Sequence, residues 1–126
     1  MATNNLKLDP RSLYEEGLKL ASEIKRLEEQ ILTSQGEIFL SDRKISEYKD
    51  EIAQAVVKAT DDEGKKKYPN DTARKIAVNN LLRDNLNYQK TLEIHRDLVN
   101  TNKINRIEIS YRERLFKLVT SLLTRD

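Results

Sequence analysis

The segment from Ile24 to Ile52, IKRLEEQILTSQGEIFLSDRKISEYKDEI, decides the fold of this chain. An isoleucine returns at every seventh position through the whole segment. The full row is Gly17, Ile24, Ile31, Ile38, Ile45, Ile52 and Ala59. A companion row holds Leu13, Leu20, Leu27, Ser34, Ser41, Tyr48 and Ala55. A sustained seven-residue repeat predicts a long helix whose apolar seam packs in a left-handed coiled coil.

Capping signals set the ends of this first helix. Asp9 can accept hydrogen bonds from the free N–H groups of a first turn, and Pro10 suits the first helical position, where no N–H is needed. We therefore expect a flexible tail over residues 1–9 and a helix over residues 10–60. The heptad pattern fades near Thr60, where turn formers and charges begin.

A single turn separates this helix from a second one. Residues 61–70 hold the only dense group of turn formers, with Gly64 suited to a positive φ and Pro69 unable to continue a helix. Asn70, Asp71 or Thr72 can cap the second helix. Residues 71–124 contain neither Gly nor Pro, so the sequence predicts one uninterrupted helix there. The expected fold is all-α: a long antiparallel two-helix coiled-coil hairpin, forming a single domain over residues 10–126.

The hairpin also implies a register. If the turn is centred near residues 65–66, Ile45 faces Leu86 and Leu20 meets Tyr111. Ser34 and Ser41 then fall opposite polar stretches of the second helix, which predicts a polar waist that fixes the register at some cost in stability. An alternative for the same region is a kink or recognition patch around Gly36, with Phe39 and Leu40 off the seam.

The end of the second helix carries more apolar residues than one stripe can use. A helix in a two-helix hairpin buries one stripe, yet residues 107–123 are apolar on more than one face. We expect this surplus to join copies of the chain into an oligomeric helical bundle. The interface residues expected are Ile107, Tyr111, Phe116, Val119 and Leu123. The alternative is that Leu6 and Leu8 of the tail cover the same patch within one chain.

Composition excludes several kinds of chemistry. The chain has 126 residues, no Cys, no Trp and one His, so thiolate metal sites, disulfides and multi-histidine sites are excluded. It contains no phosphate loop, dinucleotide fingerprint or nucleophile elbow. We therefore expect no catalytic, metal-binding or cofactor-binding residue, and no enzymatic activity. The N-terminus lacks the apolar core of a secretory signal, and no apolar run is long enough for a membrane, which predicts a cytoplasmic protein.

The sequence favours structural roles over catalytic or metal-binding ones for His95 and for the acidic run that begins at Asp61. His95, the single histidine, is expected at the polar waist, since two bare helices offer no pocket for a general base. The acidic run from Asp61 to Glu63 lacks the ligand spacing of a calcium loop and is interpreted as solvated charge.

The turn is also rich in cations and carries the alternative functional hypothesis. With 23 Lys and Arg against 21 Asp and Glu, the chain as a whole is nearly neutral. The local cluster could nevertheless contact a phosphate backbone or a protein partner. Its expected partner-binding residues are Lys65, Lys66, Lys67, Tyr68, Arg74 and Lys75.

The stretch from Gly64 to Arg74, GKKKYPNDTAR, resembles the turn of small helical-hairpin proteins encoded in phage and prophage genomes. The matching positions are Gly64, Lys65, Tyr68, Asn70, Asp71 and Arg74, with Leu82, Leu86, Tyr88 and the late pair Leu115-Phe116 after them. The resemblance implies a mobile-element accessory factor found among recombination and replication genes. The leading hypothesis is a non-enzymatic coiled-coil interaction module acting on DNA-processing or host proteins. The alternative is a nucleic-acid-binding accessory protein that uses the basic turn.

Overall fold

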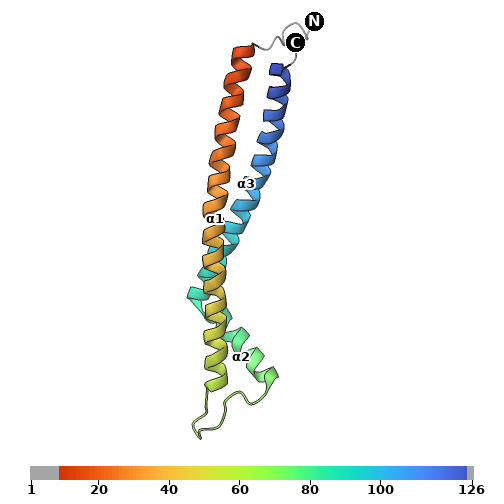
Figure 1. Ribbon diagram of the computed structural model, residues 1–126. Coiled ribbons are helices and arrows are strands. Elements are labelled where there is room, and N and C mark those ends of the chain that lie inside the picture. Colours follow the sequence, from red (N-terminus) through yellow and green to blue (C-terminus); the bar gives the residue numbers. More distant parts are fainter. Residues whose placement is uncertain (1–8, 125–126) are drawn as a thin grey trace. The chain divides into compact units, whose positions relative to one another are not determined.

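The chain folds into three α-helices, α1 (Pro10–Lys58), α2 (Asp71–Asp84) and α3 (Leu86–Thr124) (Figure 1). The computed structural model describes residues 9–124, and over these residues it contains helices and loops but no strand. The expected all-helical fold is confirmed. Most of the expected tail, with Leu6 and Leu8, lies outside the described residues.

The helices form two compact units. Unit 1 combines the described residues up to Gln35 with those from Thr101 onward, and unit 2 spans Gly36–Asn100. α1 and α3 each contribute to both units, whereas α2 belongs to unit 2 alone.

The start of α1 has the predicted capping pattern. Asp9 Oδ1 accepts from the backbone N–H of Arg11 at 3.2 Å, and Asp9 Oδ2 accepts from Ser12 Oγ at 3.3 Å. Pro10 is the first helical residue. The helix ends at Lys58, two residues earlier than expected, and it continues without a break through Gly36. Phe39 and Leu40 are exposed on its surface.

The apolar seam of α1 is covered as the heptads predict. Every member of the two rows from Leu13 to Ala59 is buried or half-buried except Ala55. Its neighbour Val56 takes the inward position instead and is 2% exposed. The sequence pattern therefore identifies the inward face of α1 correctly.

In unit 1, α1 and α3 pack side by side in opposite directions (Figure 1). A Cβ placed on Gly17 would lie 3.5 Å from Val119 Cγ1, in ordinary van der Waals contact. Further along α1, Glu23 meets Arg112 of α3. Since the residue number falls on α3 as it rises on α1, the two helices are antiparallel.

The core of unit 2 is a cluster of Ile45, Leu82 and Tyr88, one residue from each helix. Tyr48 packs on this cluster, with its ring edge-on to that of Tyr88 and the ring centroids 6.0 Å apart. Such T-shaped aromatic pairs are worth about 0.5–1.5 kcal/mol beyond the area they bury.

The predicted single helix over residues 71–124 is wrong, because it is divided at Asn85. Asn85 is extended, with φ −82° and ψ 105°, and its N–H donates to the Leu82 carbonyl. Its side-chain oxygen accepts from the Tyr88 N–H at 2.9 Å, and Gln89 Nε2 donates to the Leu82 carbonyl at 3.1 Å. Asn85 therefore closes α2 and caps α3, so the chain bends without Gly or Pro.

The predicted register is also wrong, by more than one helical turn. A turn centred near residues 65–66 would set Ser41 opposite residues 88–90, but Ser41 contacts His95. Leu86, the expected partner of Ile45, is 82% exposed. The expected register assumes one unbroken returning helix, whereas the returning chain is divided at Asn85. Residues 59–67 fold back on themselves, with Thr60 bridged to Lys66 and the Lys67 N–H donating to the Ala59 carbonyl.

Leu82 and Leu86 distinguish the observed register from the expected one. Leu82→Ala removes a core side chain and should lower the free energy of unfolding by about 2–5 kcal/mol. Leu86→Ala acts on an exposed side chain and should change it by less than about 0.5 kcal/mol. Urea denaturation monitored by circular dichroism measures both values, and a larger loss for Leu86→Ala would contradict the observed packing.

Gly36 and Gly64 should respond to alanine in opposite directions. Gly36 is helical with nothing within 4 Å of an added Cβ, so Gly36→Ala should stabilise the protein by about 0.4–1 kcal/mol. Gly64 has φ +80°, so Gly64→Ala should be destabilising despite its open surroundings. Thermal melts of the two variants test this pair, and a shift of the same sign in both would be contrary to it.

Candidate interaction surfaces

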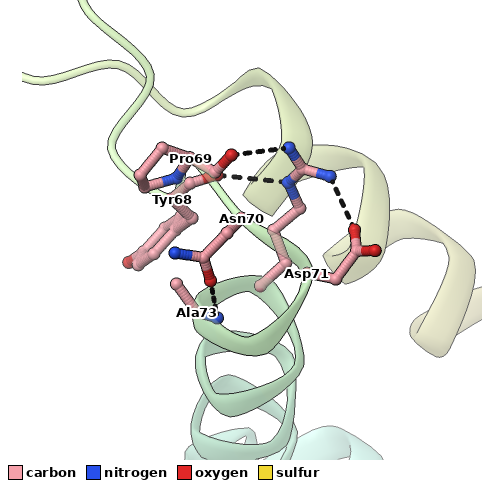
Figure 2. Close-up of polar contacts among 6 residues, drawn as sticks. Tyr68, Pro69, Asn70, Asp71 and Ala73 are labelled. Atoms are coloured by element: carbon pink, nitrogen blue, oxygen red, sulfur yellow. Dashed lines mark hydrogen bonds and ion pairs between the residues drawn. The ribbon is translucent and has the colours of Figure 1, made fainter.

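The guanidinium of Arg74 holds the end of the turn together (Figure 2). Arg74 Nε donates to the Tyr68 carbonyl at 3.1 Å, and Nη2 donates to the Pro69 carbonyl at 3.2 Å. Arg74 Nη1 pairs with Asp71 Oδ1 at 3.1 Å. Its side chain is only 29% exposed. Arg74 is therefore engaged within the turn and has few donors left for a partner.

The turn itself is built as its residues predict. Asn70 caps α2, since its Oδ1 accepts from the Ala73 N–H at 2.8 Å (Figure 2). Gly64 has the expected positive φ. Asp61 Oδ1 accepts from the N–H groups of Glu63 and Lys65, each at 2.9 Å. The Asp61 carboxylate is thus used to hold the tight turn.

The other expected partner-binding residues of the turn are in varied surroundings. Lys65 Nζ lies 4.0 Å from Glu63, and Lys67 Nζ lies 5.7 Å from the centre of the half-buried Tyr68 ring. Lys66 and Lys75 are exposed. The structure brings these cations to one end of unit 2 but places carboxylates among them, which dilutes the local positive charge.

His95 forms a polar contact across unit 2. Its Nδ1 lies 2.7 Å from Ser41 Oγ, and Ser41 donates its proton to the Ile38 carbonyl at 2.9 Å. Asp42 Oδ1 lies 3.5 Å from Nε2. The contact joins α1 to α3 at a fixed level, as a polar layer in a coiled coil does.

In unit 1 a half-buried guanidinium joins the two helices. Arg112 Nε donates to Glu23 Oε2 at 2.8 Å, and Arg112 Nη1 pairs with Glu108 of its own helix. The hydrogen bond from Arg112 lowers the pKa of the Glu23 carboxyl. Hydrogen bonds to Glu23 and then Glu108 raise the pKa of the Arg112 guanidinium, so this group stays charged.

This inward position of Arg112 explains the surface that α3 presents. The heptad row of α3 that faces α1 includes Asn105, Arg112 and Val119, two of which are polar. Four apolar residues of α3 lie on its exposed side, among them Tyr111, the expected partner of Leu20. We call them the α3 outward face: Ile104, Ile107, Tyr111 and Leu118, with exposures of 59%, 69%, 57% and 55%.

The residues expected in the oligomer interface are divided between the side of α3 that faces α1 and the α3 outward face. Ile107 and Tyr111 belong to the α3 outward face. Phe116 and Leu123 are 37% and 38% exposed and share the heptad row of the buried Asn102. Val119 is 8% exposed against Gly17, so the expectation that Val119 is uncovered is wrong. Hydropathy alone does not identify the row of α3 that faces α1, because Arg112 is held there by its ion pair with Glu23. That pair forms only in the observed register of the two helices.

Comparison of the chain with protein-family models, with curated proteins and with solved structures finds no match. Within the described residues 9–124, no helix has the length and apolar character needed to cross a membrane.

The Glu23–Arg112 pair should make stability depend on acid. Because the folded pKa of Glu23 is lowered from its ordinary value of 4.5, the pair stabilises the fold above that pH. The contribution is lost as the pH falls through the lowered folded pKa. Glu23→Gln should therefore melt below the wild type at pH 7, and the difference should shrink below pH 4.5.

The matched control is Glu113→Gln, an exposed position of α3 next to Arg112 in the sequence. This variant should match the wild-type melting curve at every pH. If Glu23→Gln melts below the wild type by the same amount from pH 7 into acid, the ion pair contributes no pH dependence to stability.

Proposed function

We propose that this chain is a non-enzymatic protein–protein interaction module that self-associates through the α3 outward face. The observation that carries the proposal is the spacing and exposure of that face. Ile104, Tyr111 and Leu118 are seven residues apart, and Ile107 lies between them. Each is more than half exposed on a helix whose opposite face already packs on α1. Contiguous apolar surface of this kind marks interaction sites on proteins.

The heptad spacing indicates that the partner surface is a helix. Apolar residues at seven-residue intervals on a helix suit another helix, packed as in a coiled coil. The antiparallel helices of unit 1 would then be part of a larger helical bundle, and the two-helix hairpin would be its repeating element. A pair of helices that buries one stripe each has little core, and association supplies more.

The resemblance of the Gly64–Arg74 turn to phage and prophage hairpin proteins supports a narrower proposal. The module would serve a mobile element as a cytoplasmic accessory factor and act on DNA-processing or host proteins. The basic turn is available to such a protein partner through Lys66 and Lys75, which are exposed. Direct binding of nucleic acid is less well supported, because Arg74 is engaged in the turn and Glu63 accompanies Lys65.

Sedimentation velocity over a range of concentrations tests self-association. The wild type should sediment as a species larger than one chain at micromolar concentration. Ile107→Glu combined with Tyr111→Glu places two charges on the α3 outward face and should shift the protein to the monomer, because carboxylates would have to be desolvated in the contact.

The control is Asn79→Glu combined with Asn80→Glu, which adds the same charge to exposed positions of α2. This control should sediment as the wild type does. A wild type that remains a monomer at high micromolar concentration refutes self-association. An oligomer that survives the change at Ile107 and Tyr111 places the contact elsewhere.

A further inference from the structure

Cations flank the α3 outward face along one of its two sides. Over residues 101–124, the heptad rows that hold this face and the row on that side contain Lys103, Arg114 and Lys117 and no carboxylate. All three cations are exposed. On the other side the adjacent row contains Glu108, which is paired with Arg112, whereas Glu113 falls outside the flanking rows. A complementary surface would therefore combine apolar side chains with carboxylates.

The α1 helix of unit 1 carries such a surface. Tyr14, Leu18 and Leu32 are 59%, 55% and 71% exposed. Leu18 lies one turn from Tyr14, and Leu32 lies about five turns from it, so the three share one face of the helix. Glu28 and Glu29 are exposed beside Leu32, and the exposed Lys25 lies midway between Leu18 and Leu32 in their heptad row. We call this set the α1 outer face.

A groove adjoins the α1 outer face at Leu32. It has a volume of about 470 Å³, and its apolar walls are Ile31, Leu32 and Ile109. Glu28 and Arg106 stand at its sides. The groove is large enough to take an aliphatic or aromatic side chain from another helix, and Glu28 can pair there with an incoming cation.

We propose that copies of this chain associate head to tail, with the α3 outward face of one copy on the α1 outer face of the next. This inference rests on the proposed self-association and specifies its geometry. The two faces lie on different helices of unit 1 and are both exposed, so they do not cover each other within one chain. Ile107 or Tyr111 enters the groove beside Leu32, and Arg114 or Lys117 meets Glu28 or Glu29.

Head-to-tail contact has a consequence that a two-fold dimer lacks. Each copy keeps one free face after its first contact, so assembly continues until a ring closes or a filament forms. A contact between two α3 outward faces would instead stop at two copies and would place cations against cations.

Mixing two complementary variants tests the geometry. The first variant is Ile107→Glu with Tyr111→Glu, which blocks the α3 outward face. The second is Leu18→Glu with Leu32→Glu, which blocks the α1 outer face. Each alone should raise the concentration of half-assembly more than about tenfold, since charges would be desolvated in the contact. An equal mixture should give a one-to-one heterodimer and nothing larger, since only one intact pair of faces remains.

The possible results separate the geometry from the self-association on which it rests. If the wild type assembles but the mixture contains no heterodimer, self-association stands and the head-to-tail geometry is wrong. If the wild type is monomeric, both proposals fail. A monomeric wild type that binds anionic lipid vesicles would assign the cationic face to a membrane and would also overturn the inference.

Charge reversal provides a second measurement that leaves the apolar contacts in place. Arg114→Glu with Lys117→Glu, and Glu28→Lys with Glu29→Lys, should each weaken assembly more than about tenfold. All four changes in one chain should restore it to within about threefold of the wild type, because the faces are again opposite in charge. An assembly that is unaffected by the changes at Glu28 and Glu29 contradicts the proposal.

Discussion

Burial of the apolar seam of α1 is the constraint on which the rest of the structure depends. Isoleucine and leucine at heptad positions cannot be left in water over 49 residues of helix, so the chain must return along α1 and cover them. Capping at Asp9, the left-handed Gly64 and the second cap at Asn70 serve that return. The side chains that cover the seam differ between the two units.

In unit 2 the cover includes Leu82 and Tyr88, and in unit 1 apolar residues such as Val119 and Leu122 share it with the polar Asn102, Asn105 and Arg112. The Arg112 side chain pairs with Glu23. Asn102 is 6% exposed, and its Oδ1 has no hydrogen-bond partner among the described residues. Buried polar groups stabilise little, yet they penalise other registers strongly. Unit 1 therefore gains a defined register from its polar contacts, and Ile104, Ile107, Tyr111 and Leu118 of α3 remain exposed.

The sequence predicts α1 well and the two later helices, α2 and α3, poorly. Heptads predict burial where apolar residues hold one phase, and a cap is recognisable where a short polar side chain precedes a helix. Asn85 is not found by sequence-based prediction, because an isolated Asn within a helical pattern costs little. It becomes a break only when its N–H donates to the Leu82 carbonyl and its side-chain oxygen accepts from the Tyr88 N–H. The inward position of Arg112 is not predictable from local pattern, since its partner Glu23 lies 89 residues away. The turn-centred register is wrong for a related reason: it assumes one unbroken returning helix, and apolar spacing does not record the division at Asn85.

Which face of α3 meets α1 in unit 1 can be measured with a single disulfide. The chain has no native cysteine, so Gly17→Cys with Val119→Cys introduces one defined pair. An added Cβ at position 17 lies 3.5 Å from Val119 Cγ1, which is within reach of a disulfide. Mild oxidation of the dilute protein should give an intramolecular bond with native helix content. Failure of that pair to close, together with closure of Leu13→Cys with Leu118→Cys, would mean that α3 turns its apolar side inward and that the outward face does not exist.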